Sequence, residues 1–170
     1  MSDFFVTLLL ENVQPRPGRS GWHGGPTPVG ALRGVTAAQA LWSPGHGRKS
    51  VWQLALHIAY WDYAVRRRLE GGTGARFPRS PANFPQVPDR ADNKAWAEDV
   101  ALVKSEHAQL AAAIAKIPSS RYRTALPGGK RWTIGELIVG IAQHEAYHTG
   151  QIQLVKRLWT SRSETFRNQD

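Results

Sequence analysis

The sequence predicts an all-α protein built as a four-helix bundle. Three amphipathic stretches, over residues 50–71, 92–118 and 133–159, carry apolar side chains at spacings of three and four residues, the period of a helix with one buried face. No stretch alternates apolar and polar residues as a half-buried strand does. A shorter apolar stretch near the N-terminus supplies the fourth helix.

Length and composition limit the class of protein. The chain has 170 residues, so we expect a single domain over residues 1–170, with a core large enough to need no disulfides. It contains no cysteine, which excludes a disulfide scaffold, a cysteine-ligated zinc site, an iron–sulfur cluster and a cysteine nucleophile. No apolar run reaches the roughly 20 residues of a membrane span, and the apolar residues 4–10 lack the flanks of a secretory signal. We expect a cytoplasmic protein with no membrane partner.

The net charge is strongly positive. Lysine and arginine number 22 against 13 aspartates and glutamates, which gives +9 at pH 7. Such a balance favours anionic partners such as nucleic acid, acidic membrane or charged metabolites. The basic residues are scattered, however, and the one triple, Arg66–Arg67–Arg68, falls at a predicted helix end, where cations stabilise the helix dipole. Few aromatic residues lie between the basic runs, so nucleic acid is the less favoured partner.

The N-terminal elements are short. We expect a first helix over residues 3–13, which the following prolines and glycines cut short. Nine prolines and glycines then fall within residues 14–30, which predicts a long loop. Thr36 and Gln39 have the form of a capping box and predict one or two helical turns that end near Trp42.

Each of the three long helices has its own start and stop signals. The last is expected to run to about Trp159, followed by a polar, frayed tail over residues 161–170. Between the first two long helices, the Gly/Pro/Arg-rich connector at residues 73–91 is long enough to cross the end or the length of a bundle. The first long helix starts at a capping box, Ser50 with Gln53, and stops at Gly71–Gly72. The second starts at Asp92 and stops at Pro118, and the third starts at a capping box, Thr133 with Glu136.

Four of the six histidines fall on predicted inward faces: His57, His107, His144 and His148. His144 and His148 lie one turn apart on the last helix, so one imidazole sits above the other. Polar groups inside an apolar bundle cost roughly a few kcal/mol each unless they have partners. A divalent metal would partner His57, His144 and His148 and leave an open position for water or substrate, as catalytic sites do. The alternative is a hydrogen-bonded core cluster.

The string HEAYH at residues 144–148 also matches the HExxH pattern of zinc proteases, in which the glutamate is the general base. The elongated form of that pattern requires glycine and histidine where this chain has Gln151 and Leu154, and no substrate-aligning sheet is predicted. The protease interpretation is therefore the weaker one. Glu145 stays a candidate base for activated water; the alternative is a solvent-facing charge or the partner of a neighbouring arginine.

These motifs resemble the DinB/YfiT-like superfamily of four-helix-bundle metalloenzymes. The resemblance covers most of the chain, from about Trp22 to Trp159. The matching segments are residues 50–61 (SVWQLALHIAYW) and 144–152 (HEAYHTGQI), with further matches at 22–24 (WHG), at 32–36 (LRGVT) and at 39–40 (QA).

The resemblance implies a divalent metal, usually zinc or nickel, held by His57, His144 and His148 with water on the open side. It also implies a long crossover between the second and third helices of the bundle, to which the connector at residues 73–91 corresponds. Relatives include thiol S-transferases that use bacillithiol or mycothiol, and a mycothiol-dependent isomerase. A homodimer is expected on the same grounds.

The first functional hypothesis is a metal-dependent enzyme of the thiol S-transferase or hydrolase type, whose open metal position activates water or a thiol cosubstrate. Glu145 would act as the base. His107 would hydrogen-bond the nucleophile or support a ligand; the alternative is a core histidine bonded to a backbone carbonyl or to water. Basic residues in the loop before the last helix would bind an anionic cosubstrate: Arg121, Arg123, Lys130 and Arg131.

The second hypothesis is a non-enzymatic module, for example in a stress response. The histidines would then hold a structural metal or form a buried polar network, and the protein would act through a basic surface that binds anions or nucleic acid. Salt separates the two hypotheses, because binding to phosphates weakens steeply as salt rises.

Overall fold

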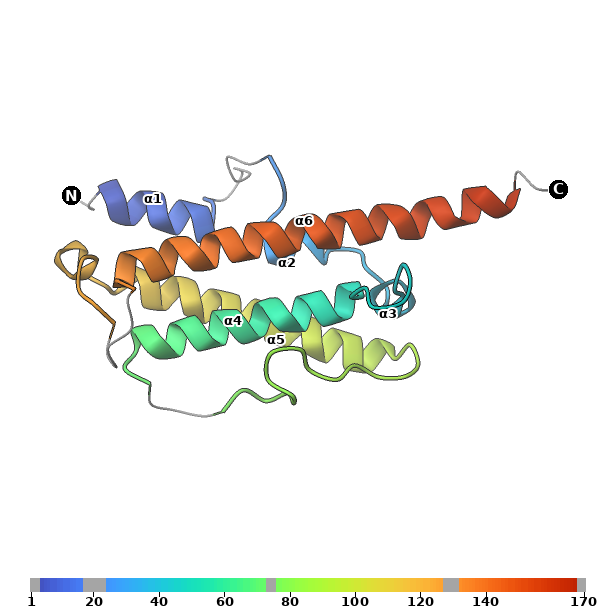
Figure 1. The fold of residues 1–170 in the computed structure, drawn as a ribbon, viewed down its shortest axis with the longest axis horizontal. Helices are drawn as coiled ribbons and strands as arrows, with labels where there is room; N and C mark the ends of the chain where they lie inside the picture. Colours follow the sequence, from blue (N-terminus) through green and yellow to red (C-terminus); the bar gives the residue numbers. More distant parts are fainter. Residues whose placement is uncertain (1–3, 17–23, 73–75, 127–131, 168–170) are drawn as a thin grey trace.

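The computed structural model of the protein describes residues 4–16, 24–72, 76–126 and 132–167. Within these ranges every regular element is helical, which confirms the expectation of an all-α protein. None of the described helices is both long and apolar enough to cross a membrane. The elements are α1 (Phe4–Val13), α2 (Pro28–Ala31), α3 (Ala37–Leu41), α4 (Val51–Leu69), α5 (Asn93–Ala115), the 3-10 turn η1 (Ser119–Arg121) and α6 (Ile134–Arg167) (Figure 1).

The start of α4 follows the predicted capping box. The Ser50 hydroxyl accepts a hydrogen bond from the backbone N–H of Gln53, and the Gln53 side chain accepts one from the backbone N–H of Ser50. After the helix, Gly71 and Gly72 both have a φ of +85°. Residues with side chains adopt that conformation only at a cost, so the glycine pair ends the helix where the sequence predicts.

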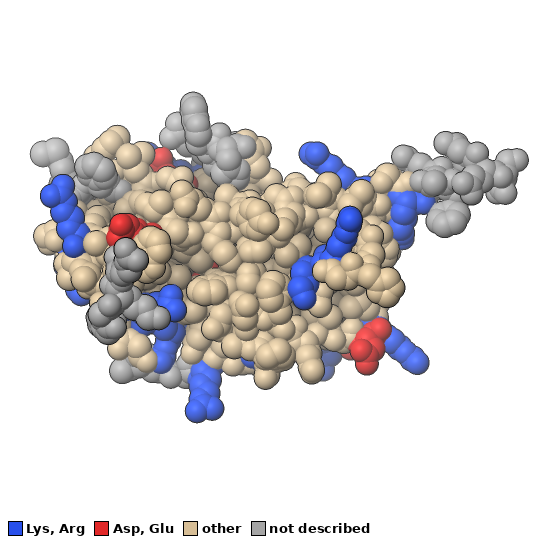
Figure 2. All heavy atoms as spheres, viewed as in Figure 1, with Lys and Arg blue, Asp and Glu red and all other residues tan. Residues whose placement is uncertain are grey.

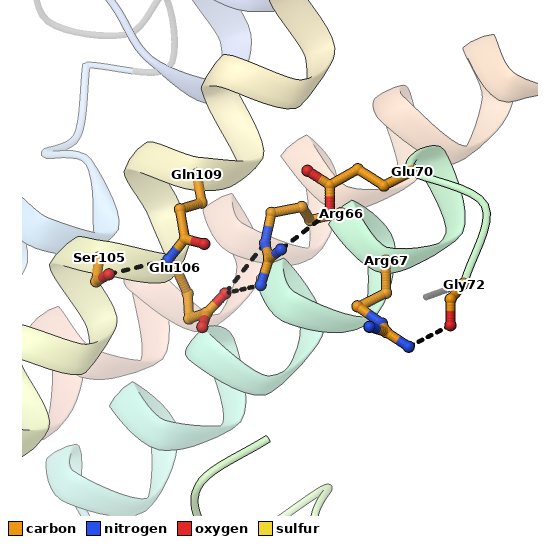
Figure 3. A network of polar contacts seen from close by, with 7 residues as sticks. All are labelled: Arg66, Arg67, Glu70, Gly72, Ser105, Glu106 and Gln109. Carbon is orange, nitrogen blue, oxygen red and sulfur yellow. Dashed lines mark hydrogen bonds and ion pairs between the residues drawn. The ribbon is translucent and has the colours of Figure 1, made fainter. Parts of the chain in front are cut away.

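An ion-pair network ties the C-terminal part of α4 to α5 (Figure 3). The Arg66 guanidinium lies 3.0 Å from the Glu106 carboxylate on α5 and 3.0 Å from Glu70, one turn further along α4. Glu106 is buried, so losing its partner would leave an uncompensated charge in the core. The network therefore fixes α4 against α5 near the residues that form the site.

The long helices α5 and α6 also begin at their predicted caps. The Asp92 carboxylate accepts hydrogen bonds from two backbone N–H groups of the first turn of α5. Thr133 and Glu136 form a reciprocal capping box at the start of α6. The predicted end of α6 near Trp159 was wrong, because the helix continues to Arg167. Residues 160–167 contain no glycine or proline, so no residue there breaks the helix.

One helical turn was missed within the predicted loop at residues 14–30. The Thr27 side chain caps α2 by accepting a hydrogen bond from the backbone N–H of Gly30, and Pro28 takes the first helical position. Proline is favourable there, because its fixed φ suits a helix and its missing N–H would have no partner. The short helix α3 begins at Ala37, and Thr36 caps it as predicted. Residues 17–23 of the loop lie outside the described residues.

Helix α4 lies at the centre and packs along both α5 and α6, while α1 packs on α5 and α6. In Figure 1, α4 and α5 both run from right to left, and α6 runs the opposite way. The connector between α4 and α5 therefore returns along the length of the molecule. On the way it brings residues 83–84 against α4, at the level of His57.

Two apolar clusters form the core. The first contains Ile58, Val103 and Ile152, together with most of the buried face of the N-terminal half of α4. The second contains Leu110 and Ile138 and extends to α1. On each of α4, α5 and α6, buried polar side chains fall between the residues of the two clusters. The core is thus divided by a polar layer, and the candidate site lies in this layer.

Candidate metal centre

The polar layer brings His57 of α4 together with His144 and His148 of α6. The Nε2 atom of His57 lies 3.1 Å from Nε2 of His144 and 3.1 Å from Nε2 of His148. His57 is buried and the other two are half-buried. This group, here called the histidine triad, offers three imidazole nitrogens close enough together to hold one metal ion.

Hydrogen bonds fix which nitrogen carries the proton on two of these rings. His57 donates from Nδ1 to the backbone carbonyl of Asn83, 2.7 Å away, and His148 donates from Nδ1 to Oε1 of Gln151, also 2.7 Å away. In a neutral imidazole the other nitrogen then carries a lone pair. The two Nε2 atoms that face each other at 3.1 Å therefore both present lone pairs, so neither can donate to the other.

The triad is electrostatically suited to a cation rather than to protons. Burial lowers the pKa of His57 and of His148. Burial and the two neighbouring imidazoles lower the pKa of His144 to about 4. The three rings are neutral at neutral pH, which is the protonation state that binds a metal.

The connector between α4 and α5 covers one side of the triad. Phe84 stacks on the His57 ring, with the centroids 4.0 Å apart and the planes 6° from parallel. Asn83 accepts from His57 through its backbone carbonyl and from the indole N–H of Trp61, at 3.0 Å, through its side chain. The stacking on Phe84 and the hydrogen bond to Asn83 hold the imidazole of His57 in one orientation, as a pre-formed metal ligand requires.

A cavity of about 350 Å³ opens beside the triad. His148, Gln151 and Phe84 form part of its wall. Two cationic side chains, Arg48 and Lys49, also line it, and the ammonium of Lys49 lies 4.6 Å from the Phe84 ring centroid. The volume suits a small molecule. The remaining lining residues are Pro44, Gly47, Leu54, Tyr147, Leu154, Val155 and Leu158.

Glu145 and His107 lie in the polar layer but contact each other. His107 on α5 donates from Nδ1 to Oε1 of Glu145, 3.0 Å away, and lies 3.6 Å from Oδ2 of Asp62 on α4. Among the described residues, no hydrogen bond or ion pair joins Glu145 to the histidine triad. These three side chains, here called the acidic cluster, form a second group that could hold a metal ion.

The structure corrects the alternatives considered for these two residues. Glu145 is only 2% exposed, so it is neither a solvent-facing charge nor the partner of an arginine. It lies one turn after Ile141 on α6, on a face that packs into the core. The partner of His107 is a carboxylate and not a backbone carbonyl. Although burial opposes it, Asp62 and Glu145 raise the pKa of His107 to about 10.

Of the four predicted anion-binding residues, the two that the structure describes are not brought to the cavity. Arg121 and Arg123 are exposed beyond the C-terminal end of α5, and neither lines the cavity beside the triad. Lys130 and Arg131 lie outside the described residues. On the face drawn in Figure 2, cationic side chains are scattered, some right of the centre and others toward the margins, and form no continuous basic patch. This face gives no support to a phosphate-binding surface.

Several residues of the site were not found from the sequence. Asp62 had a usable signal, because it continues the helical spacing from Ile58 to Val65 and so lies on the inward face of α4. Gln151 also had one, since it follows His148 by one turn. The contributions of Lys49 and Phe84 had none, because they depend on how two connecting segments fold over the helices.

Comparison with known families gives one finding. The family model of the DinB superfamily matches residues 29–152. That stretch runs from α2 into α6 and contains every residue of the histidine triad and of the acidic cluster. Searches of curated proteins and of solved structures give no match.

Proposed function

The chain belongs to the DinB superfamily, and we propose that it is a metal-dependent enzyme whose divalent ion, zinc or nickel, is held by His57, His144 and His148. The reaction would be of the thiol S-transferase or hydrolase type, with water or a low-molecular-weight thiol as the nucleophile. The four helices α1, α4, α5 and α6 would form a four-helix bundle in one domain over residues 1–170, with the connector at residues 73–91 as its crossover. A homodimer and a cytoplasmic location stay predictions.

The facing lone pairs of His57 and His148 carry this proposal. Two lone pairs 3.1 Å apart repel each other unless a cation or proton lies between them. A four-coordinate ion about 2.0–2.1 Å from each nitrogen separates its ligands by roughly 3.3 Å. The observed separations are close to this value, and the donor set of three imidazoles fits zinc or nickel.

The remaining side chains orient the ligands. The bonds from His57 to Asn83 and from His148 to Gln151 fix the tautomers, so that both Nε2 atoms point into the site. A bound divalent ion would lower the pKa of a water or thiol at its open position toward neutrality. Glu145 and His107 as base and hydrogen-bond donor stay predictions, since the contacts described for them are with each other and with Asp62.

The cavity supports a small anionic substrate with an apolar part. Leu54, Leu154 and Phe84 provide apolar wall, while Arg48 and Lys49 provide positive charge at the same opening. Arg48 and Lys49 would bind the anionic group of the substrate, the role predicted for Arg121, Arg123, Lys130 and Arg131. Because the chain has no cysteine, any thiol in the reaction must arrive as a cosubstrate.

Metal content tests the proposal. Untagged wild-type protein, His148→Ala and His46→Ala would be purified in parallel and analysed for transition metals, then assayed for thiol transfer. His46 is exposed and lies outside the triad, so it is a matched control. We expect His148→Ala to contain one equivalent less metal than wild type and to lose activity, and His46→Ala to match wild type. Equal metal in all three proteins would contradict the proposal.

A further inference from the structure

We propose that Asp62, His107 and Glu145 form a second divalent-cation site, separate from the histidine triad. The three ligands come one each from α4, α5 and α6, so a cation there would join the three helices at their centre. The ion would be of the zinc or manganese type, which accepts mixed imidazole and carboxylate ligands. This inference does not depend on the metal of the histidine triad, and it assigns Glu145 and His107 to a cation in place of the base and donor roles predicted for them.

The distances within the acidic cluster fit a small ion. Nδ1 of His107 lies 3.0 Å from Oε1 of Glu145 and 3.6 Å from Oδ2 of Asp62. These values lie on either side of the roughly 3.3 Å that separates the ligands of a tetrahedral zinc ion. An ion at that point would take the place of the proton that His107 now shares with Glu145.

Burial and missing hydrogen bonds supply an independent observation. Asp62, Glu145 and His107 are 0%, 2% and 5% exposed. Neither carboxylate oxygen of Asp62 has a hydrogen-bond partner among the described residues, and the ion pair described for it is the 3.6 Å approach to His107. Burying a carboxylate without hydrogen-bond donors costs free energy of folding. A cation bound to the two oxygens of Asp62 would remove that cost, which the surrounding side chains do not do.

Charge balance points the same way. The carboxyl groups of Asp62 and Glu145 lie close together in the core, with ligand atoms within 4.8 Å of each other, and two carboxylates so close repel each other unless a cation or a proton lies between them. A divalent ion bound to two carboxylates and a neutral imidazole has no net charge, which removes that repulsion. Calcium fits poorly, because it takes six to eight oxygen ligands and this group offers an imidazole and two carboxylates.

Cobalt and zinc titrations of chelator-treated protein test the second site. Co²⁺ is the optical probe and Zn²⁺ is counted by equilibrium dialysis. We expect wild type to bind two equivalents, the His144→Ala/His148→Ala double variant to bind one, and Asp62→Asn to bind one. The triple variant should bind none. Asp99→Asn, which changes a buried aspartate outside the cluster, should bind two.

The double variant alone is decisive, whatever the effect of Asp62→Asn on folding. If folded His144→Ala/His148→Ala, checked by circular dichroism, binds no Co²⁺ and no Zn²⁺, the second site is wrong. If it binds as much metal as wild type while Asp62→Asn loses one equivalent, the second site stands and the metal of the proposed function fails. The two proposals can therefore fail separately.

Discussion

The histidine triad and the acidic cluster lie in one polar layer, yet they hold their imidazoles in opposite states. Burial without a counter-charge lowers the pKa of the triad histidines, that of His144 to about 4. In the acidic cluster, burial is outweighed by Asp62 and Glu145, which raise the pKa of His107 to about 10. The comparison shows that neighbouring carboxylates, and not burial alone, decide whether a core histidine without bound metal is neutral or protonated.

The two regions also differ in access. The triad borders the cavity of about 350 Å³, whereas all three members of the acidic cluster are buried. An open site suits exchange of water and substrate, and a closed site suits a structural role. The predictions below test this division, beginning with the largest expected effect.

Replacing His107, the protonated imidazole of the acidic cluster, should reduce the free energy of unfolding more than any other change considered. In chelator-treated protein, His107→Leu leaves Asp62 and Glu145 without a positive partner, and we expect a loss of about 3–5 kcal/mol in the free energy of unfolding. The same change in the triad, His148→Leu, removes no charge and should cost less than about 1 kcal/mol. Urea denaturation measures both. Equal losses would mean that the two regions do not differ electrostatically.

Removing a support of the triad should weaken metal binding without unfolding the protein. Gln151→Ala takes away the acceptor for the Nδ1 proton of His148, and such losses cost about 10- to 100-fold in metal affinity. Gln109→Ala, an exposed glutamine on α5 (Figure 3), is the control and should leave the affinity unchanged. Competition with a chromophoric chelator gives both values. An unchanged affinity in Gln151→Ala would argue that His148 is not a ligand.

Metal removal should show two phases. A chelator added to fully loaded protein should take the ion of the triad first, because the cavity opens on it, and the ion of the acidic cluster later, because release there requires local opening of the packed helices. Asp62→Asn should remove the slow phase alone, and His148→Ala the fast phase alone. Release in one phase that persists in both variants would remove the distinction in access.

The smallest expected effect concerns charge at the cavity. Lys49→Gln should weaken binding of mercaptoacetate to the zinc-loaded protein by about fivefold, since an exposed charge pair contributes roughly 1 kcal/mol. Binding of neutral 2-mercaptoethanol should not change. Isothermal titration calorimetry with both thiols gives the ratio of wild-type to variant affinity for each. If both weaken alike, Lys49 shapes the cavity without recognising charge.

The helices and the triad could be predicted because their signals are local. Capping boxes, glycine stops and the spacing of His144 and His148 each involve a few neighbouring residues. The direction of Glu145 could not be predicted in the same way. Helix α6 packs against more than one partner helix, so residues on two adjacent stripes of its surface point inward. The spacing of the histidine stripe alone therefore does not decide between the two alternatives given for Glu145.

The residues around the cavity could not be predicted for a different reason. Phe84 and Lys49 belong to connecting segments, and their places beside the triad depend on long-range contacts with α4 and α6. Anion binding was predicted for the loop before α6 because four basic residues lie close together there in the sequence. Density along the chain does not show which charges reach a cavity.

The central claim is that His57, His144 and His148 hold a divalent ion through their Nε2 atoms. The most direct measurement is an anomalous difference map from crystals of zinc-loaded protein, recorded on both sides of the zinc absorption edge. We predict a peak about 2.0–2.1 Å from each of the three Nε2 atoms. Crystals that show no peak between the three imidazoles, with the rings still in contact, would contradict the account.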